Sequence, residues 1–194
     1  MRMRRVTGFI LLMVCAWTLF NGKGIPFAAN PSQEEKDRNY FTDLPVLTHE
    51  GKELRFYSDL LKDRVVLISF FYTNCPTAQL GLVTLFKLQK LLENRLGTDI
   101  YLFSLSVDPE KDHLKALQEY AAKFNPQKGW VFLSGKKEHL TVINQRLGNR
   151  NPNPELHIQL FVLGNLKTGH WMKLPETAHP YAVAEGLRTL AAEK

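Results

Sequence analysis

Residues 65–79 read VVLISFFYTNCPTAQ, and this stretch organises the chain around it. It begins as an apolar run rich in β-branched and aromatic side chains, which predicts a strand buried on both faces. It ends in Thr-Asn-Cys-Pro, a turn whose proline suits the start of a helix. The leucines that follow recur three or four residues apart, which predicts a helix: Leu82, Leu85, Leu88, Leu92 and Leu96.

Cys75 lies where this predicted strand gives way to the helix N-terminus. Open α/β sheets place their chemistry at this edge. The unpaired N–H groups and the positive end of the helix dipole favour a thiolate there, and the thiolate is the reactive form of cysteine. We therefore expect Cys75 to be a functional residue. The alternative is a small buried thiol that packs in a turn.

Further strands and helices alternate along the chain. Residues 41–57 predict a hairpin that turns at Gly51, and residues 58–62 predict a single helical turn. After the central strand we expect strands at residues 99–107, 130–133 and 158–163, each preceded by a helix. A strand at residues 170–174 then forms a hairpin with residues 158–163 through the turn at 164–169, and a last helix follows Pro180. This order predicts an α/β protein of thioredoxin-like fold, with a central mixed sheet flanked by helices, an N-terminal hairpin and one strand–helix insertion.

Residues 1–29 have the pattern of a leader. Three arginines precede an apolar segment at residues 6–20, which is typical of a secretory signal and short for a membrane span. We expect export with cleavage near Ala29, and an uncleaved N-terminal membrane anchor is the alternative. Residues 30–40 are polar and predict a flexible tether, so that residues 41–194 form the folded domain.

The formal net charge of +6 comes mostly from this leader. The leader holds four basic residues and no acid, so residues 30–194 carry only +2. The basic balance therefore gives no argument for a nucleic-acid partner. The positive N-terminal flank predicts that the domain is exported, either into the periplasm or anchored to the membrane and facing the periplasm.

Four segments of the chain resemble the Sco/SenC family: residues 70–76 (FFYTNCP), 106–112 (SVDPEKD), 130–135 (WVFLSG) and His157 ahead of 161–163. The resemblance extends over residues 41–192. It implies a membrane-tethered thioredoxin-like domain that binds copper and assists assembly of the copper centre of cytochrome oxidase. Some family members look more like thiol–disulfide reductants. The implied partner is an oxidase assembly partner, or another thiol or copper protein.

The resemblance implies copper ligands at Cys75 and His157, with a second cysteine four residues after the first. Gln79 occupies that position in this chain. Two thiolates and an imidazole form a soft site suited to copper, whereas an amide oxygen is a hard, neutral and weak ligand. We therefore expect a weakened copper site. We expect no disulfide within the domain, because the only other cysteine, Cys15, lies in the leader.

The other polar candidates carry less weight. A protonated His157 beside Cys75 would favour the thiolate, and the alternative for His157 is a strand-end histidine that hydrogen-bonds locally. Asp108 and Asp112 flank Pro109 near a predicted helix start, where we expect them to cap the helix. The remaining histidines are scattered without metal-ligand spacing.

Three functions stay open on the sequence. The first is a Sco/SenC-like exported protein that assists assembly of respiratory copper centres through a weakened site at Cys75 and His157. The second is an enzyme, a single-cysteine thiol reductant or peroxidase that cycles Cys75 through a sulfenic acid or a mixed disulfide. The third is a degenerate binding module in which Cys75 is incidental. We favour the first, which makes the protein an assembly factor rather than an enzyme.

Overall fold

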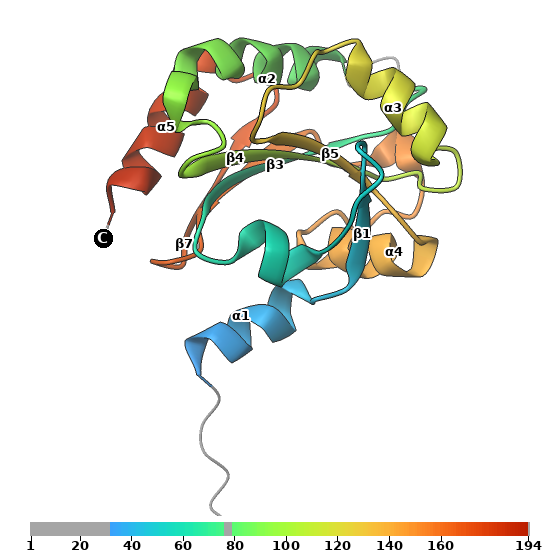
Figure 1. Cartoon of the computed structure of the whole chain (residues 1–194), viewed down its shortest axis with the longest axis horizontal. Coiled ribbons are helices and arrows are strands. Elements are labelled where there is room, and N and C mark those ends of the chain that lie inside the picture. Colours follow the sequence, from blue (N-terminus) through green and yellow to red (C-terminus); the bar gives the residue numbers. More distant parts are fainter. Residues whose placement is uncertain (1–31, 76–78, 194) are drawn as a thin grey trace, which may run out of the picture. The chain divides into compact units, whose positions relative to one another are not determined.

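The computed structural model describes residues 32–75 and 79–193, with Gln79 given by its backbone alone. The predicted leader and its cleavage site, Cys15 and the start of the tether lie outside these residues. The described chain forms a seven-stranded sheet in the order β2-β1-β5-β4-β3-β6-β7 (Figure 1). The strands are β1 (Pro45–Thr48), β2 (Glu53–Arg55), β3 (Val65–Phe71), β4 (Ile100–Ser106), β5 (Trp130–Ser134), β6 (Leu160–Asn165) and β7 (His170–Pro175).

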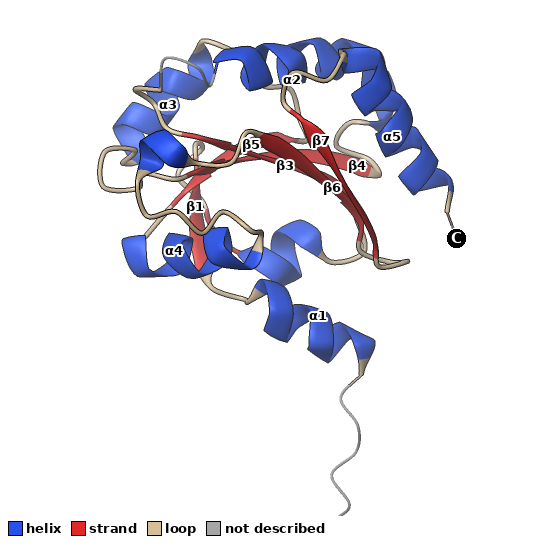
Figure 2. Cartoon of the chain, turned by 180° about the vertical axis from the view of Figure 1, so that it is seen from behind, coloured by secondary structure: helices blue, strands red, loops and turns tan. Residues whose placement is uncertain are grey.

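Helices cover both faces of this sheet, as Figure 2 shows from behind. One face packs against α2 (Gln79–Leu92), α3 (Leu114–Ala122) and α5 (Pro180–Ala192). The other face packs against α1 (Gln33–Phe41), the short π-helical turn η1 (Phe56–Leu61) and α4 (Lys137–Arg146). Two short 3-10 turns complete the chain, η2 (Glu93–Arg95) and η3 (Pro154–Leu156). The predicted thioredoxin-like α/β fold is confirmed.

The central strand β3 has all seven residues buried, as its apolar run predicts. It pairs in parallel with β4 over its whole length, from Val65 opposite Ile100 to Phe71 opposite Ser106. On its other side it pairs antiparallel with β6. The carboxyl ends of β3 and β4 therefore lie side by side, and the residues that follow each strand meet at one edge of the sheet.

Buried polar groups in the centre of the sheet are satisfied. Ser69 Oγ lies 3.0 Å from Ser104 Oγ, and the indole nitrogen of Trp130 donates to Ser104 Oγ at 3.0 Å. This short chain ties β3, β4 and β5 together through their side chains. Because burying an unpaired hydroxyl is costly, the arrangement lets two serines lie in the core without penalty.

Helix α1 replaces part of the predicted flexible tether. Ser32 caps the helix by accepting a hydrogen bond from the backbone N–H of Glu35 at 3.2 Å. Lys62 holds the helix to the domain through an ion pair with Glu34, and Phe41 is buried at its end. The polar residues that favoured a tether lie mostly on the exposed surface of this helix. Its contacts with the rest of the domain could not be seen in the sequence.

None of the helices formed by the described residues is long and apolar enough to span a bilayer.

Candidate functional site

Cys75 follows β3 by four residues and closes a tight turn. Its backbone N–H donates to the carbonyl oxygen of Tyr72 at 3.0 Å, and its side chain is buried with 6% of its surface exposed. Helix α2 begins at Gln79. The structure thus confirms the predicted place of Cys75 between a buried strand and a helix N-terminus. The side chain of Gln79 and residues 76–78 lie outside the described part of the chain.

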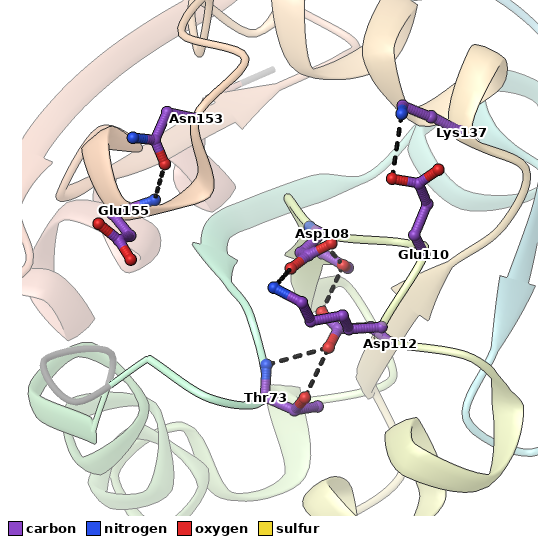
Figure 3. Close-up of polar contacts among 9 residues, drawn as sticks. Thr73, Asp108, Glu110, Asp112, Lys137, Asn153 and Glu155 are labelled. Carbon is purple, nitrogen blue, oxygen red and sulfur yellow. Dashed lines mark hydrogen bonds and ion pairs between the residues drawn. The ribbon is translucent and has the colours of Figure 1, made fainter.

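Asp112 fixes the start of this turn, and Figure 3 shows its contacts. Its carboxylate accepts hydrogen bonds from the backbone N–H of Thr73 at 3.1 Å and from the Thr73 hydroxyl at 2.7 Å. Its other oxygen accepts from the Ser106 hydroxyl at 2.6 Å. Asp112 is fully buried, and this burial raises its pKa above the usual range despite the three donors. Two residues before Cys75, the backbone is therefore locked to the end of β4.

The expectation that Asp108 and Asp112 cap helix α3 is wrong. The residue before the helix is His113, and its side chain makes no cap hydrogen bond. Asp108 pairs instead with Lys111 at 3.0 Å, and its backbone N–H donates to Ser106 Oγ at 3.1 Å. The carboxylate of Asp112 instead binds the Thr73 side of the Cys75 turn and the end of β4, because parallel pairing of β3 and β4 brings Thr73 and Ser106 to the same edge of the sheet. These contacts could not be predicted from the position of Asp108 and Asp112 in the sequence near a helix start.

His157 lies just after η3, three residues before β6, and is buried with 6% of its surface exposed. Its Nδ1 lies 2.7 Å from the carbonyl oxygen of Pro154. A carbonyl can only accept a hydrogen bond, so Nδ1 carries the proton and the neutral ring has its lone pair on Nε2. That Nε2 is buried and has no hydrogen-bond partner. The turn itself is held by Asn153, whose side chain accepts from the N–H of Glu155 at 3.0 Å (Figure 3).

The side chain of Tyr72 contacts both Cys75 and His157. Its ring meets the His157 ring edge to face, with centroids 5.9 Å apart. Its hydroxyl hydrogen-bonds with Cys75, and burial together with this contact raises the pKa of Tyr72 above its ordinary value. The two predicted site residues, separated by 82 positions in the sequence, are therefore neighbours of one tyrosine side chain.

A chain of hydrogen bonds links the Cys75 turn to the His157 segment. The amide nitrogen of Asn144 donates to the carbonyl oxygen of Ser106 at 3.1 Å. The Asn144 oxygen accepts from Asn149 Nδ2 at 3.1 Å, and Asn149 Oδ1 in turn accepts from the N–H of Ile158 at 3.3 Å. Because Ser106 also binds Asp112, one continuous network with a buried centre joins Thr73, two residues before Cys75, to Ile158, the residue after His157.

Tyr120 is a buried polar residue that the sequence did not single out. It projects from α3, is 5% exposed, and its hydroxyl is buried with no hydrogen-bond partner. Burial raises its pKa to about 12, and the charges of Cys75 and Asp112 act in the same direction. Within its helix Tyr120 occupies an ordinary core position, so no local signal separated it from the packing residues around it.

Glu176 is a second residue that the sequence did not single out. It follows β7, is 6% exposed, and burial raises its pKa to about 7. Its carboxylate fills the space beside Gly81 in the first turn of α2, where an added Cβ would meet Glu176 Oε2 at 2.8 Å. In the sequence it stands in Pro-Glu-Thr, which has the composition of a loop; only the pairing of its N–H with the Gln159 carbonyl oxygen places it here.

No three His, Cys, Asp or Glu side chains within residues 32–75 and 79–193 gather into a metal site. The described donors at this corner are thus the Cys75 sulfur and the His157 Nε2. Other histidine rings are engaged elsewhere: His49 accepts from the N–H of Phe132, and His139 lies 3.0 Å from the Pro45 carbonyl oxygen.

A model of the SCO1/SenC family matches residues 34–152, a span that includes Cys75 and Asp112 and ends before His157. A SCO2-like protein of Rickettsia conorii is 30% identical over 123 residues, or 62% of this chain and 57% of that protein. The aligned part of the chain thus spans just over half the length of this curated relative.

Solved structures show the same fold. ScoI of Bradyrhizobium japonicum with copper bound has a TM-score of 0.62 at 20% identity, with 75% of this chain and 96% of that chain covered. BsSco, a member of the Sco family of cytochrome c oxidase assembly proteins, has a TM-score of 0.64 at 23% identity, with 78% and 92% covered. At these identities the likeness establishes the fold.

Proposed function

The chain belongs to the SCO1/SenC family, and on that premise we propose that it binds copper through Cys75 and His157 and assists assembly of a respiratory oxidase copper centre. The observation that carries this proposal is the buried, unpartnered Nε2 of His157. A buried ring nitrogen normally finds a hydrogen-bond partner, and one without a partner has its lone pair available for a metal. Tyr72 contacts both this ring and Cys75.

The donor set suits Cu(I). A thiolate is a soft ligand and an imidazole nitrogen binds copper well, so one of each can hold Cu(I) at low coordination number. The hydrogen bond from His157 Nδ1 to Pro154 fixes the tautomer and the orientation of the ring, as in many metal sites where the second ring nitrogen is anchored. Copper would be the ion that is passed to the oxidase, and Cys75 and His157 would hold it and release it.

Gln79 gives the proposed site its particular character. The amide that replaces a second thiolate is a poor ligand for Cu(I), so the ion would be held by fewer soft donors than a Cys-x-x-x-Cys loop provides. We propose that the site is correspondingly weak and gives up its copper readily to a partner with more soft ligands. The partner in this proposal is an oxidase assembly protein or another thiol or copper protein.

The place of action follows from the leader. Arginines ahead of the apolar residues 6–20 support export, with the domain in the periplasm or tethered to the membrane and facing the periplasm. Fractionation of cells that express the full chain, with protease added to spheroplasts, tests this assignment. Protection of the domain from protease in intact spheroplasts would contradict it.

The direct test is an anaerobic Cu(I) titration of the full chain in a Cys15→Ser background, so that Cys75 is the sole thiol. We expect one-to-one binding that falls about 100-fold or more in Cys75→Ala and in His157→Ala, since each removes a ligand and not merely an outer contact. His139→Ala is the matched control, because His139 is half-buried and, like His157, has a ring nitrogen on a backbone carbonyl.

Two other outcomes have distinct meanings. Equal loss in His139→Ala would show that the histidine variants act through folding. Binding that is absent in the parent protein and appears only in Gln79→Cys would overturn the copper proposal and direct attention to Cys75 as a redox thiol. In that case, hydrogen peroxide would be reduced to water as the Cys75 thiol becomes a sulfenic acid, and an external thiol would then condense with the sulfenic acid to form a mixed disulfide and release a second water.

A further inference from the structure

A cavity of about 460 Å³ lies among α1, the C-terminal end of α4 and the hairpin of β6 and β7. A space of this size can hold part of a small organic molecule. Its apolar lining is formed by Phe41, Leu147, Val162 and Trp171. The core around these side chains lies on the face of the sheet that α1 and α4 cover, whereas Cys75 belongs to the core under α2, α3 and α5 (Figure 1). The cavity is therefore separate from the proposed copper site.

Trp171 forms a fixed aromatic wall of this cavity. In the register of β6 with β7 it lies opposite Gly164, where an added Cβ would overlap the indole ring. Phe41 packs against the same ring, with centroids 5.1 Å apart and an angle of 35° between the planes. A glycine inside a strand often marks the close approach of another group, and here it makes room for the indole. The indole is only partly buried, so it presents apolar surface to the cavity.

Three cationic side chains border the cavity: Arg146 and Arg150 near the end of α4, and Lys173 on β7. All three are exposed, and within the described part of the chain none of them forms an ion pair. An added Cβ at Gly148 would lie 3.4 Å from Lys173 Nζ, so the ammonium reaches from β7 to the end of α4. Asp37 is the one acid that the described residues contribute to the lining. The lining is therefore positive overall, and its guanidinium groups suit a phosphate or a carboxylate.

The position of the cavity in the chain favours a lipid as the source of this anion. The cavity is lined by α1, and residues 21–31 join α1 to the apolar segment at residues 6–20. Those 11 residues span at most about 40 Å, so a chain anchored through the apolar segment keeps the cavity near a bilayer surface. Tyr40 at the rim is 52% exposed. Tyrosine and tryptophan beside cationic side chains are typical of the membrane–water interface. The leader has no acidic side chain, so it cannot neutralise the cations itself.

We propose that this cavity binds the headgroup of an anionic phospholipid. Arg146, Arg150 and Lys173 would contact the phosphate, and Trp171 would contact the glycerol and the first acyl carbons. The inference goes beyond the copper function and rests only on the membrane-tethered location in the proposed function. Binding through the face covered by α1 and α4 would turn the layer that contains Cys75 away from the lipid, where a protein partner can reach it.

The test is a titration of phosphatidylglycerol into the full chain in neutral detergent micelles, in a Trp17→Phe background. Trp130 is buried, so a change in emission reports on Trp171. We expect phosphatidylglycerol to shift the emission to shorter wavelength with about tenfold higher affinity than phosphatidylcholine, because only the first lipid carries a net negative charge. Arg150→Gln combined with Lys173→Gln should weaken binding of phosphatidylglycerol about 30-fold and leave that of phosphatidylcholine unchanged.

Lys87→Gln combined with Lys128→Gln is the matched control, since it removes the same charge from exposed lysines that do not line the cavity. It should leave the affinity for phosphatidylglycerol unchanged. An equal loss in this control, or equal affinity of the parent chain for the two lipids, would overturn the proposal.

Inorganic phosphate and glycerol 3-phosphate distinguish a lipid from a soluble anion. We expect neither to displace phosphatidylglycerol at equal concentration, because neither has an apolar part to contact Trp171. Displacement by either one would show that the cavity takes a soluble anion, and the lipid assignment would be wrong. The outcome is separable from the proposed function: if fractionation contradicts export, or the parent chain binds no Cu(I), while phosphatidylglycerol is still preferred, the proposed function fails and the lipid site stands.

Discussion

The two sides of the Cys75 turn differ in how completely their polar groups are satisfied. On the side of β4, Asp112 accepts three hydrogen bonds, and the network continues through Ser106 and Asn144 to Asn149. On the side of α3 and η3, Tyr120 and His157 each present a buried polar atom with no partner. In the described part of the chain only one other buried side-chain atom, Thr42 Oγ1, shares that condition.

We interpret the hydrogen-bonded side as structural and the side with unpartnered polar atoms as functional. A saturated hydrogen-bond network rigidifies the backbone that it joins, and here it fixes Thr73 and Ile158 next to the two site residues. Unsatisfied buried atoms lower stability, and they persist in native proteins chiefly where a ligand or a change of state supplies the partner. Substitutions on the first side should therefore cost stability, and substitutions on the second side should cost function alone.

The largest expected loss follows from removing Asp112. Asp112→Ala strands the Thr73 N–H and the Thr73 and Ser106 hydroxyls in a buried site, so we expect the free energy of unfolding to fall by about 3–5 kcal/mol. Urea denaturation measures it. Asp112→Asn keeps an acceptor for Thr73 and should cost less than half as much. Equal costs for the two variants would mean that shape, rather than hydrogen bonding, holds the turn.

The buried carboxylate of Glu176, beside the first turn of α2, should make the stability of the protein depend on pH. Its pKa is about 7 in the folded protein against 4.5 as an ordinary value, so it binds more protons folded than unfolded between these pH values. Stability therefore falls as pH rises from about 4.5 to 7, by up to about 3 kcal/mol. Glu176→Gln should remove this loss.

The measurement is the difference in unfolding free energy between Glu176→Gln and the parent protein from pH 4 to pH 8, which cancels the contribution of every other titrating group. We expect this difference to grow in favour of the variant across that range. A difference that does not change with pH would show that Glu176 is hydrated or paired in solution.

Asn144 links the end of β4 to the His157 segment through hydrogen bonds. Asn144→Ala removes the donor to the Ser106 carbonyl and the acceptor for Asn149, so two buried groups lose a partner and we expect a cost of about 2 kcal/mol. Hydrogen exchange adds a local test, because the Ile158 N–H that binds Asn149 should lose protection. Unchanged exchange at Ile158 would break the proposed continuity of the network.

Tyr120→Phe should have the smallest effect on stability. The hydroxyl has no partner to lose, so we expect the free energy of unfolding to stay within about 0.5 kcal/mol of the parent value or to rise. Thermal or urea unfolding of the metal-free protein measures this. A loss above about 1 kcal/mol would show that the hydroxyl is bonded in solution, and the contrast between the two sides of the turn would then disappear.

Much of the fold could be predicted because local patterns carry it. The apolar run of β3, the hairpin at Gly51 and the leucine spacing of α2 each depend on residues only a few positions apart. The polar surface of α1 concealed a helix, because its stability comes from Ser32, Lys62 and Phe41 acting together. Weakly amphipathic helices depend on such contacts more than on propensity.

For the candidate site, the sequence by itself determined that Cys75 stands between a buried strand and a helix, since strand, turn and helix signals are contiguous there. Only the tertiary structure decided what surrounds the sulfur. Tyr72 meets His157 through the pairing of β3 with β6, and Asp112 reaches Thr73 through the parallel register of β3 and β4. Those contacts join residues 39 or more positions apart, and strand register, which no local pattern encodes, sets them.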